Sequence, residues 1–215
     1  MVSIDEMGSP IRIDGYDTYV LSVVRGLKSE ADKVSSAFEQ LKPQILAMSI
    51  SPEEIKGLKA FIEEPFEVEM SRYEELYAAR LSKFGDVFLP PPCFLAGLEE
   101  ADKAGADLIG IDMDDETHTT AYCALVSGRD LFVHSTRFKI VKMKSFRAKT
   151  PAEFAIAWDR KVNNLKGFRE LEREREAFMS KELMRLSSSG KKVLALIDTE
   201  RANGVRKILT KEKKN

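Results

Sequence analysis

One uninterrupted apolar run of the chain is Val193-Leu194-Ala195-Leu196-Ile197. Three similar runs span residues 18–24, 45–50 and 107–111. A strand with one face in water alternates apolar and polar residues, whereas a strand covered by helices on both faces is apolar almost throughout. The four runs therefore predict buried strands in an α/β fold whose central β-sheet is mostly parallel and flanked by α-helices.

Helix signals separate the apolar runs. Ser29 begins a segment whose apolar residues recur at helical spacing until Pro43, and Ser51 provides a cap for a second helix. Further helices are expected at 70–83, from 151 onward and at 165–186. The three prolines at 90–92 indicate a stiff extended spacer. The segment 112–147 fits either helices or an antiparallel β excursion.

The size of the chain favours one domain. A chain of 215 residues, 43% hydrophobic and 32% charged, predicts one sizeable core beneath a densely charged surface. We assign residues 1–14 to an N-terminal extension, 15–210 to a single α/β domain and 211–215 to a charged tail. No internal repeat is visible.

Charge and cysteine usage narrow the function classes. The formal net charge of -1 lacks the basic excess that nucleic-acid binding needs, so we expect no nucleic-acid partner. Without a signal-like start or a run of about 18 apolar residues, we expect a cytoplasmic protein with no membrane partner. Cys93 and Cys123 form no CxxC pair, so we predict two reduced, mostly buried thiols. We also predict no cofactor. The oligomeric state is not predicted, and a homodimer is left open.

Polar residues follow each of the four predicted strands. They are Arg25, Ser49, Ser51, Asp112, Asp114, Asp115, Asp198, Glu200 and Arg201. In open α/β sheets, ligands bind beyond the carboxyl ends of the strands, so these residues are the first candidates for a site. Helix caps and loop residues occupy such positions about as often.

Arg175 interrupts an apolar stripe in the long helix expected at 165–186. The stripe contains Phe168, Leu171, Met179 and Leu183. A guanidinium directed toward a core needs an acid, a carbonyl or a bound anion, because burying it unpaired is costly. We prefer a structural salt bridge over a ligand contact at Arg175.

Four segments carry motifs of a known family. They are Tyr19-Val20-Leu21-Ser22-Val23-Val24-Arg25, residues 42–50 beginning Lys42-Pro43, Glu174-Arg175-Glu176-Ala177-Phe178-Met179, and residues 193–205 with Gly204. They resemble four motifs of the TraB/PrgY (TraB/GumN) family. In the same order, these motifs are a strand ending in G-T-x-H, a K-P-x-x-x-x-V-E-L strand, an E-R-[DN]-x-x-M helix and a closing V-V-G-x-x-H-x-x-G-I segment. The family is grouped with ChaN-like proteins and erythromycin esterases. The resemblance covers most of the chain and implies the EreA/ChaN-like (TraB-like) form of the α/β fold.

The chain departs from this pattern where the family's enzymes are thought to act. Arg25 and Arg201 stand at the two histidine positions, Ser49 replaces the glutamate, and Met113 replaces the arginine that follows Asp112. Arginine has no free lone pair and a pKa above about 12, so it cannot hold a metal ion. His118 and His134 lie outside the motifs. The resemblance therefore implies a degenerate, non-catalytic domain, for which we predict no catalytic residue and no metal site.

Two versions of the former metal site stay open. Its predicted residues are Arg25, Ser49, Asp112, Arg175, Asp198, Glu200 and Arg201. Unpaired arginines would bind a small anionic ligand or a peptide end, whereas arginines paired with Asp112, Asp198 and Glu200 would make the site purely structural.

Two other functions remain alternatives. One is a metal-dependent hydrolase, either protease-like or a magnesium phosphohydrolase that uses Asp112 and Asp114. The other is an interaction scaffold that presents the Glu/Arg-rich long helix and residues 65–83 to a partner.

Overall fold

The computed structural model describes residues 10–13 and 15–212. Its sheet has the order β1 (Ile11–Arg12), β2 (Thr18–Val23), β5 (Val193–Asp198), β3 (Ile45–Met48) and β4 (Asp107–Gly110). All neighbouring strands are parallel except β1, which pairs antiparallel with β2. The predicted α/β class with a mostly parallel sheet is confirmed, and the four apolar runs form the four parallel strands.

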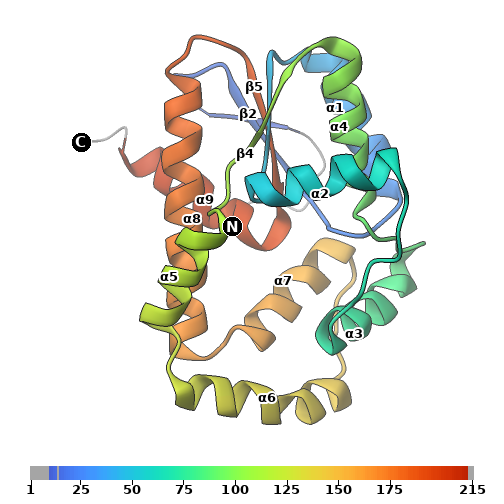
Figure 1. Cartoon of the computed structure of the whole chain (residues 1–215), viewed down its shortest axis with the longest axis vertical. Coiled ribbons are helices and arrows are strands. Elements are labelled where there is room, and N and C mark those ends of the chain that lie inside the picture. Colours follow the sequence, from blue (N-terminus) through green and yellow to red (C-terminus); the bar gives the residue numbers. More distant parts are fainter. Residues whose placement is uncertain (1–9, 14, 213–215) are drawn as a thin grey trace.

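Helices cover both faces of the sheet (Figure 1). The helices α1 (Ser29–Leu41) and α4 (Pro92–Ala104) pack on one face, and α8 (Lys166–Ser187) and α9 (Thr199–Glu212) pack on the other. The helix α2 (Pro52–Glu63) begins just beyond β3 and contributes to the first of these cores. This double cover explains why the strands lack polar alternation.

The central strand β5 shows how both cores depend on one apolar run. Leu194 and Leu196 contribute to the core beneath α1 and α4. Val193, Ala195 and Ile197 contribute to the core beneath α8 and α9. Because successive side chains of a strand point to opposite faces, every residue of the run is buried.

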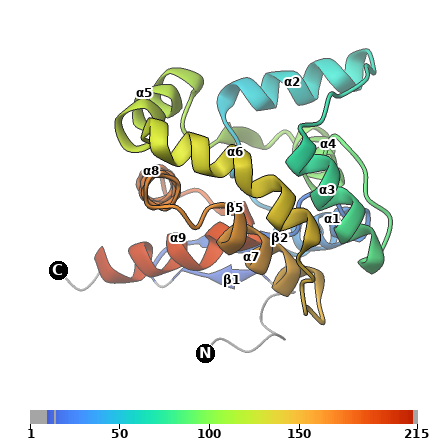
Figure 2. The same cartoon turned by 90° about the horizontal axis from the view of Figure 1, so that it is seen from below.

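Four helices lie beyond the carboxyl ends of the strands, and we call them the cap (Figures 1 and 2). They are α3 (Arg72–Leu81), α5 (Asp115–Leu125), α6 (Gly128–Met143) and α7 (Pro151–Val162), with a short 3-10 turn, η2 (Ser82–Phe84), after α3. An aromatic core around Phe154 and Trp158 joins α3, α6 and α7 to one another. The cap thus closes over the edge of the sheet where ligands bind in α/β folds.

The structure corrects three expectations about the chain. The predicted spacer at 90–92 is followed by a helix that the sequence analysis missed, since Pro92 is the first residue of α4. Part of the predicted N-terminal extension joins the sheet as β1, while residues 1–9 lie outside the described residues. Cys93 is buried as expected, but Cys123 is exposed.

For the segment 112–147 the sequence left helices and an antiparallel β excursion as alternatives, and the structure has helices there. The segment forms α5 and α6, and Ser127 begins α6 with a capping box to Asp130. Of the predicted charged tail, residues 211–212 belong to α9, and residues 213–215 lie outside the described residues. Within the described ranges, no helix is both long enough and apolar enough to cross a membrane.

Candidate functional site

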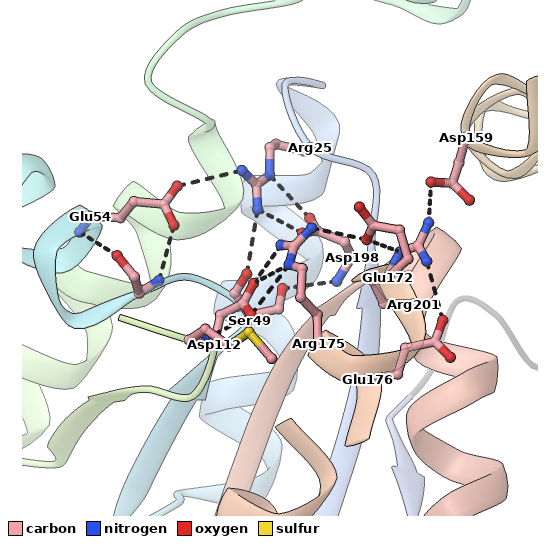
Figure 3. A network of polar contacts seen from close by, with 12 residues as sticks. Arg25, Ser49, Glu54, Asp112, Asp159, Glu172, Arg175, Glu176, Asp198 and Arg201 are labelled. Carbon is pink, nitrogen blue, oxygen red and sulfur yellow. Dashed lines mark hydrogen bonds and ion pairs between the residues drawn. The ribbon is translucent and has the colours of Figure 1, made fainter. Parts of the chain in front are cut away.

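The exits of the four parallel strands converge at one place beneath the cap (Figure 3). Arg25, Ser49, Asp112 and Asp198 lie there because parallel strands end at the same edge of the sheet. Arg175 reaches this place from α8, and Arg201 lies beside it on α9. We call the three arginines and their carboxylate partners the strand-exit cluster.

Arg25 joins the exits of β2, β3 and β5. Its Nε and Nη2 donate to Asp198 Oδ1 and Oδ2 at 3.2 and 2.6 Å, and Nη2 also donates to the Ser49 carbonyl at 3.4 Å. Ser49 Oγ accepts a hydrogen bond from the Asp198 backbone N–H at 3.0 Å. Burial lowers the pKa of Arg25, but the neighbouring carboxylates of Asp198, Glu54 and Glu200 together outweigh burial and hold the pKa above its ordinary value. The guanidinium is therefore a fixed positive charge with a fixed partner.

Arg175 forms a fork-shaped ion pair with Asp112. Its Nε lies 3.3 and 3.1 Å from the two carboxylate oxygens of Asp112, and its Nη2 also contacts Oδ2. Glu172, one turn earlier on α8, accepts from Arg175 Nη1 at 2.9 Å. The preferred interpretation of Arg175 as a salt-bridged residue is confirmed, with Asp112 as its principal partner.

Arg201 binds acids that the sequence analysis did not single out. Its Nη2 contacts Asp159 on α7, its Nε lies 3.4 Å from Glu172 and its Nη1 lies 3.2 Å from Glu176. Only 7% of its side chain is exposed. Arg201 thus ties α9 to both α7 and α8. The spacing of Glu172 and Glu176 on the same helical face was the one signal in the sequence for this site.

Glu200 behaves differently from the other predicted site residues. Within the described chain it makes no ion pair, whereas the purely structural version of the site would pair it with an arginine. Burial and the charge of Asp198 raise the pKa of Glu200 to about 7. Its side chain is partly exposed to a pocket, so we place Glu200 beside the strand-exit cluster and outside its ion pairs.

The pocket at Glu200 lies between the sheet edge and the cap. It has a volume of about 200 Å³. Its lining includes Arg25, Tyr73, Glu74, Tyr77, Trp158 and Glu200, together with Asp159, Val162 and Asn163. Tyr73 and Tyr77 both contact Trp158 edge-on, with ring centroids 6.5 and 5.6 Å apart. The pocket therefore combines aromatic walls with carboxylates, and its one arginine is already paired.

The carboxylates proposed for a magnesium site have structural partners. Asp112 is held by Arg175 and accepts the Met113 backbone N–H at 2.8 Å. Asp114 caps α5 by accepting the Thr117 backbone N–H at 2.7 Å, a bond that lowers the pKa of Asp114. Across residues 10–13 and 15–212, no three His, Cys, Asp or Glu side chains are grouped as metal ligands. The geometry thus offers the hydrolase alternative no assembled site.

The two histidines pack in the cap. The His134 ring stacks on Tyr73 and Phe168, with centroid distances of 4.8 and 4.6 Å. His118 lies in α5, 6.1 Å from the ring of Tyr122. Both positions agree with the interpretation of these histidines as ordinary packing residues.

Comparison with known proteins assigns no family. No protein-family model matches the chain, and no curated protein shows significant similarity to it. The resemblance to the TraB/PrgY family therefore stays a prediction.

Proposed function

We propose that this chain is a non-catalytic binding domain in which the strand-exit cluster is structural and the pocket at Glu200 holds the ammonium group of a small amine or a peptide end. One observation carries the proposal. Each of the three arginines is neutralised by a carboxylate, whereas Glu200 faces the pocket with no ion-pair partner in the described residues.

The balance of charge in the strand-exit cluster disfavours an anionic ligand. Six carboxylates surround the three guanidinium groups: Glu54, Asp112, Asp159, Glu172, Glu176 and Asp198. An added phosphate or carboxylate would meet this acidic surplus and would have to displace an existing fork-shaped pair. Of the two versions left open by the sequence, these contacts support the structural one.

The chemistry of the pocket suits a cation. An ammonium group is attracted to the faces of Trp and Tyr within about 6 Å and to carboxylates. Trp158, Tyr73 and Tyr77 supply the rings, and Glu74 and Glu200 supply the negative charge. A volume of about 200 Å³ admits one terminal residue or a short amine. We therefore favour a peptide amino terminus over a long substrate.

The single tryptophan of the chain reports directly on this pocket. Trp158 is the only Trp in 215 residues and lines the pocket, so its fluorescence can be titrated with trialanine amide. We expect saturable binding of the free peptide and at least about tenfold weaker binding of its N-acetylated form, which lacks the ammonium charge. Glu200→Gln should weaken binding by a similar factor, and Glu75→Gln, an exposed site outside the pocket lining, should not.

The affinity should depend on pH through Glu200. Because the pKa of Glu200 is raised to about 7, its carboxylate becomes charged only as the pH rises through neutrality. Binding should strengthen from pH 5.5 to 7.5 in the wild type and stay flat in Glu200→Gln. Equal binding of both peptides, or saturable binding of sulfate in place of the amine, would show that the pocket is not an ammonium site.

A further inference from the structure

The helix α6 exposes large apolar side chains to solvent. Phe132 is 70% exposed, Ile140 is 53% exposed and Met143 is 87% exposed. Met143 and Phe132 are the two most exposed large hydrophobic residues of the described chain. Exposing such side chains is unfavourable in water, and clusters of them mark interaction surfaces.

Three of the four exposed large apolar residues of α6 share one face, and Leu131, which is 42% exposed, lies outside that face. With roughly 100° between successive residues of a helix, Phe132, Ile140 and Met143 fall within one sector of about 80°. The opposite face holds the helix on the protein, since Val141 is buried and His134 stacks on Tyr73 and Phe168. Phe132, Ile140 and Met143 therefore project from the side of α6 opposite its packing contacts, on a face that also carries Arg129 and Thr136.

Positive charge is concentrated in α6 and in the residues that follow it. Residues 129–149 contain seven basic side chains and one acidic side chain, a net charge of +6 in a chain whose net charge is -1. The basic residues are Arg129, Arg137, Lys139, Lys142, Lys144, Arg147 and Lys149. Lys139, Lys142 and Lys144 are exposed and make no ion pair within the described residues. Four of the seven basic residues lie in α6 and three follow it, so the surface of α6 is both apolar and cationic.

The position of α6 leaves this surface accessible. In Figure 1 the helix lies at the end of the molecule far from the sheet, and in Figure 2 it crosses the side that faces the viewer. No described helix or strand lies over it in either view. The outward face of α6 can therefore meet a flat surface without rearrangement of the cap.

We propose that α6 binds the surface of a membrane that contains anionic lipids. A helix with an apolar face and flanking lysines lies in the interfacial plane, where its apolar side chains enter the acyl boundary and its lysines meet phosphate headgroups. Phe132 and Met143 are the inserted side chains, and Lys139, Lys142 and Lys144 bind the headgroups. The sequence analysis expected no membrane partner because no apolar run is long enough to span a membrane. Binding to the membrane surface needs no such run.

Two other occupants fit the surface less well. A second copy would bring one +6 segment against another, which is repulsive. A protein partner for this cationic helix would need an apolar groove lined with acidic residues. Binding of the chain to an acidic polymer would indicate such a partner. The convex, protruding apolar side chains instead suit a deformable lipid surface.

Co-sedimentation of the full chain with vesicles tests the proposal. We expect binding to vesicles of 70% phosphatidylcholine and 30% phosphatidylglycerol, little binding to pure phosphatidylcholine, and weaker binding at 0.5 M than at 0.05 M salt. The double variant Phe132→Ser/Met143→Ser should lose at least about tenfold in affinity. Each change of Lys139 or Lys142 to Gln should lose about fivefold.

A matched control separates this surface from general stickiness. Phe66 is 53% exposed but lies outside α6, so Phe66→Ser should bind anionic vesicles as the wild type does. Circular dichroism should show all variants folded, because the substituted side chains face solvent. Binding to poly-glutamate without binding to vesicles would overturn the proposal in favour of an acidic protein partner. Failure to bind vesicles, or equal binding by the double variant, would also overturn it.

Discussion

Asp112 is the residue on which the structural role of the strand-exit cluster can be judged most directly. Only 5% of its side chain is exposed, and it faces Arg175, a guanidinium that the fold holds at the sheet edge. A buried charge that loses its partner destabilises the folded state more than the intact pair stabilises it. The Asp112–Arg175 pair is therefore sensitive to the loss of either member.

Asp112→Asn should lower the free energy of unfolding by about 2–3 kcal/mol, because among the described residues Arg175 would keep only Glu172 as a charged partner. Urea denaturation followed by far-UV circular dichroism measures the change. Asp114→Asn is the matched control: Asn caps helices as well as Asp, so its effect should stay below about 0.5 kcal/mol. Similar losses in the two variants would contradict a structural role for the pair.

At the scale of elements, the first turn of α8 fixes the junction with α5 and α6. A Cβ at Gly167 would lie 2.5 Å from the Leu125 carbonyl oxygen and 2.9 Å from Val126 Cα. These are backbone atoms, so neither can rotate away. The close approach explains how α8 can begin directly against the turn between the two cap helices.

Gly167→Ala should therefore destabilise the protein by about 1–3 kcal/mol, since the junction must shift to admit the methyl group. Gly57 provides the comparison within a helix, because a Cβ there meets nothing within 4 Å. Gly57→Ala should stabilise the protein by about 1 kcal/mol through helix propensity alone. Thermal or urea denaturation of the pair gives the answer, and a neutral Gly167→Ala would show that the junction is loose.

At the scale of the whole molecule, Arg201 links the cap to the sheet. It stands at the start of α9, directly after β5, and contacts Asp159 of α7 as well as two acids of α8. Trp158, the neighbour of Asp159, lies in the aromatic core of the cap. Tryptophan fluorescence therefore follows the cap, whereas circular dichroism follows all helices.

In the wild type, the two probes should report one unfolding transition. Arg201→Leu should cost about 3 kcal/mol and should move the fluorescence transition to lower urea than the circular dichroism transition, because Asp159 loses its cation. Arg185→Leu is the control, since within the part of the chain that the structure describes Arg185 pairs only with Glu182 on the same exposed helix face. Coincident transitions in Arg201→Leu would mean that the cap is held by packing alone.

Local patterns in the sequence were sufficient for most of the elements. The apolar runs predicted the parallel strands, and Ser29, Ser51 and Thr150 marked helix starts close to those observed. The helix α4 was missed because its initial proline was assigned to a spacer. The segment 112–147 stayed ambiguous because the apolar residues of α6 include Phe132 and Met143, which face solvent, so they form no single buried stripe.

The sequence by itself determined that Arg25, Ser49, Asp112 and Asp198 meet at the sheet edge, because the ends of parallel strands necessarily converge. Only the tertiary structure decided how they pair. Asp198 binds Arg25, while Arg201 takes Asp159 from α7 and Glu200 remains at the pocket. The strands and helices follow from interactions among neighbouring residues, but these charge pairs join residues up to 173 positions apart. Their choice of partner depends on how distant strands and helices pack together, a long-range property that no local pattern encodes.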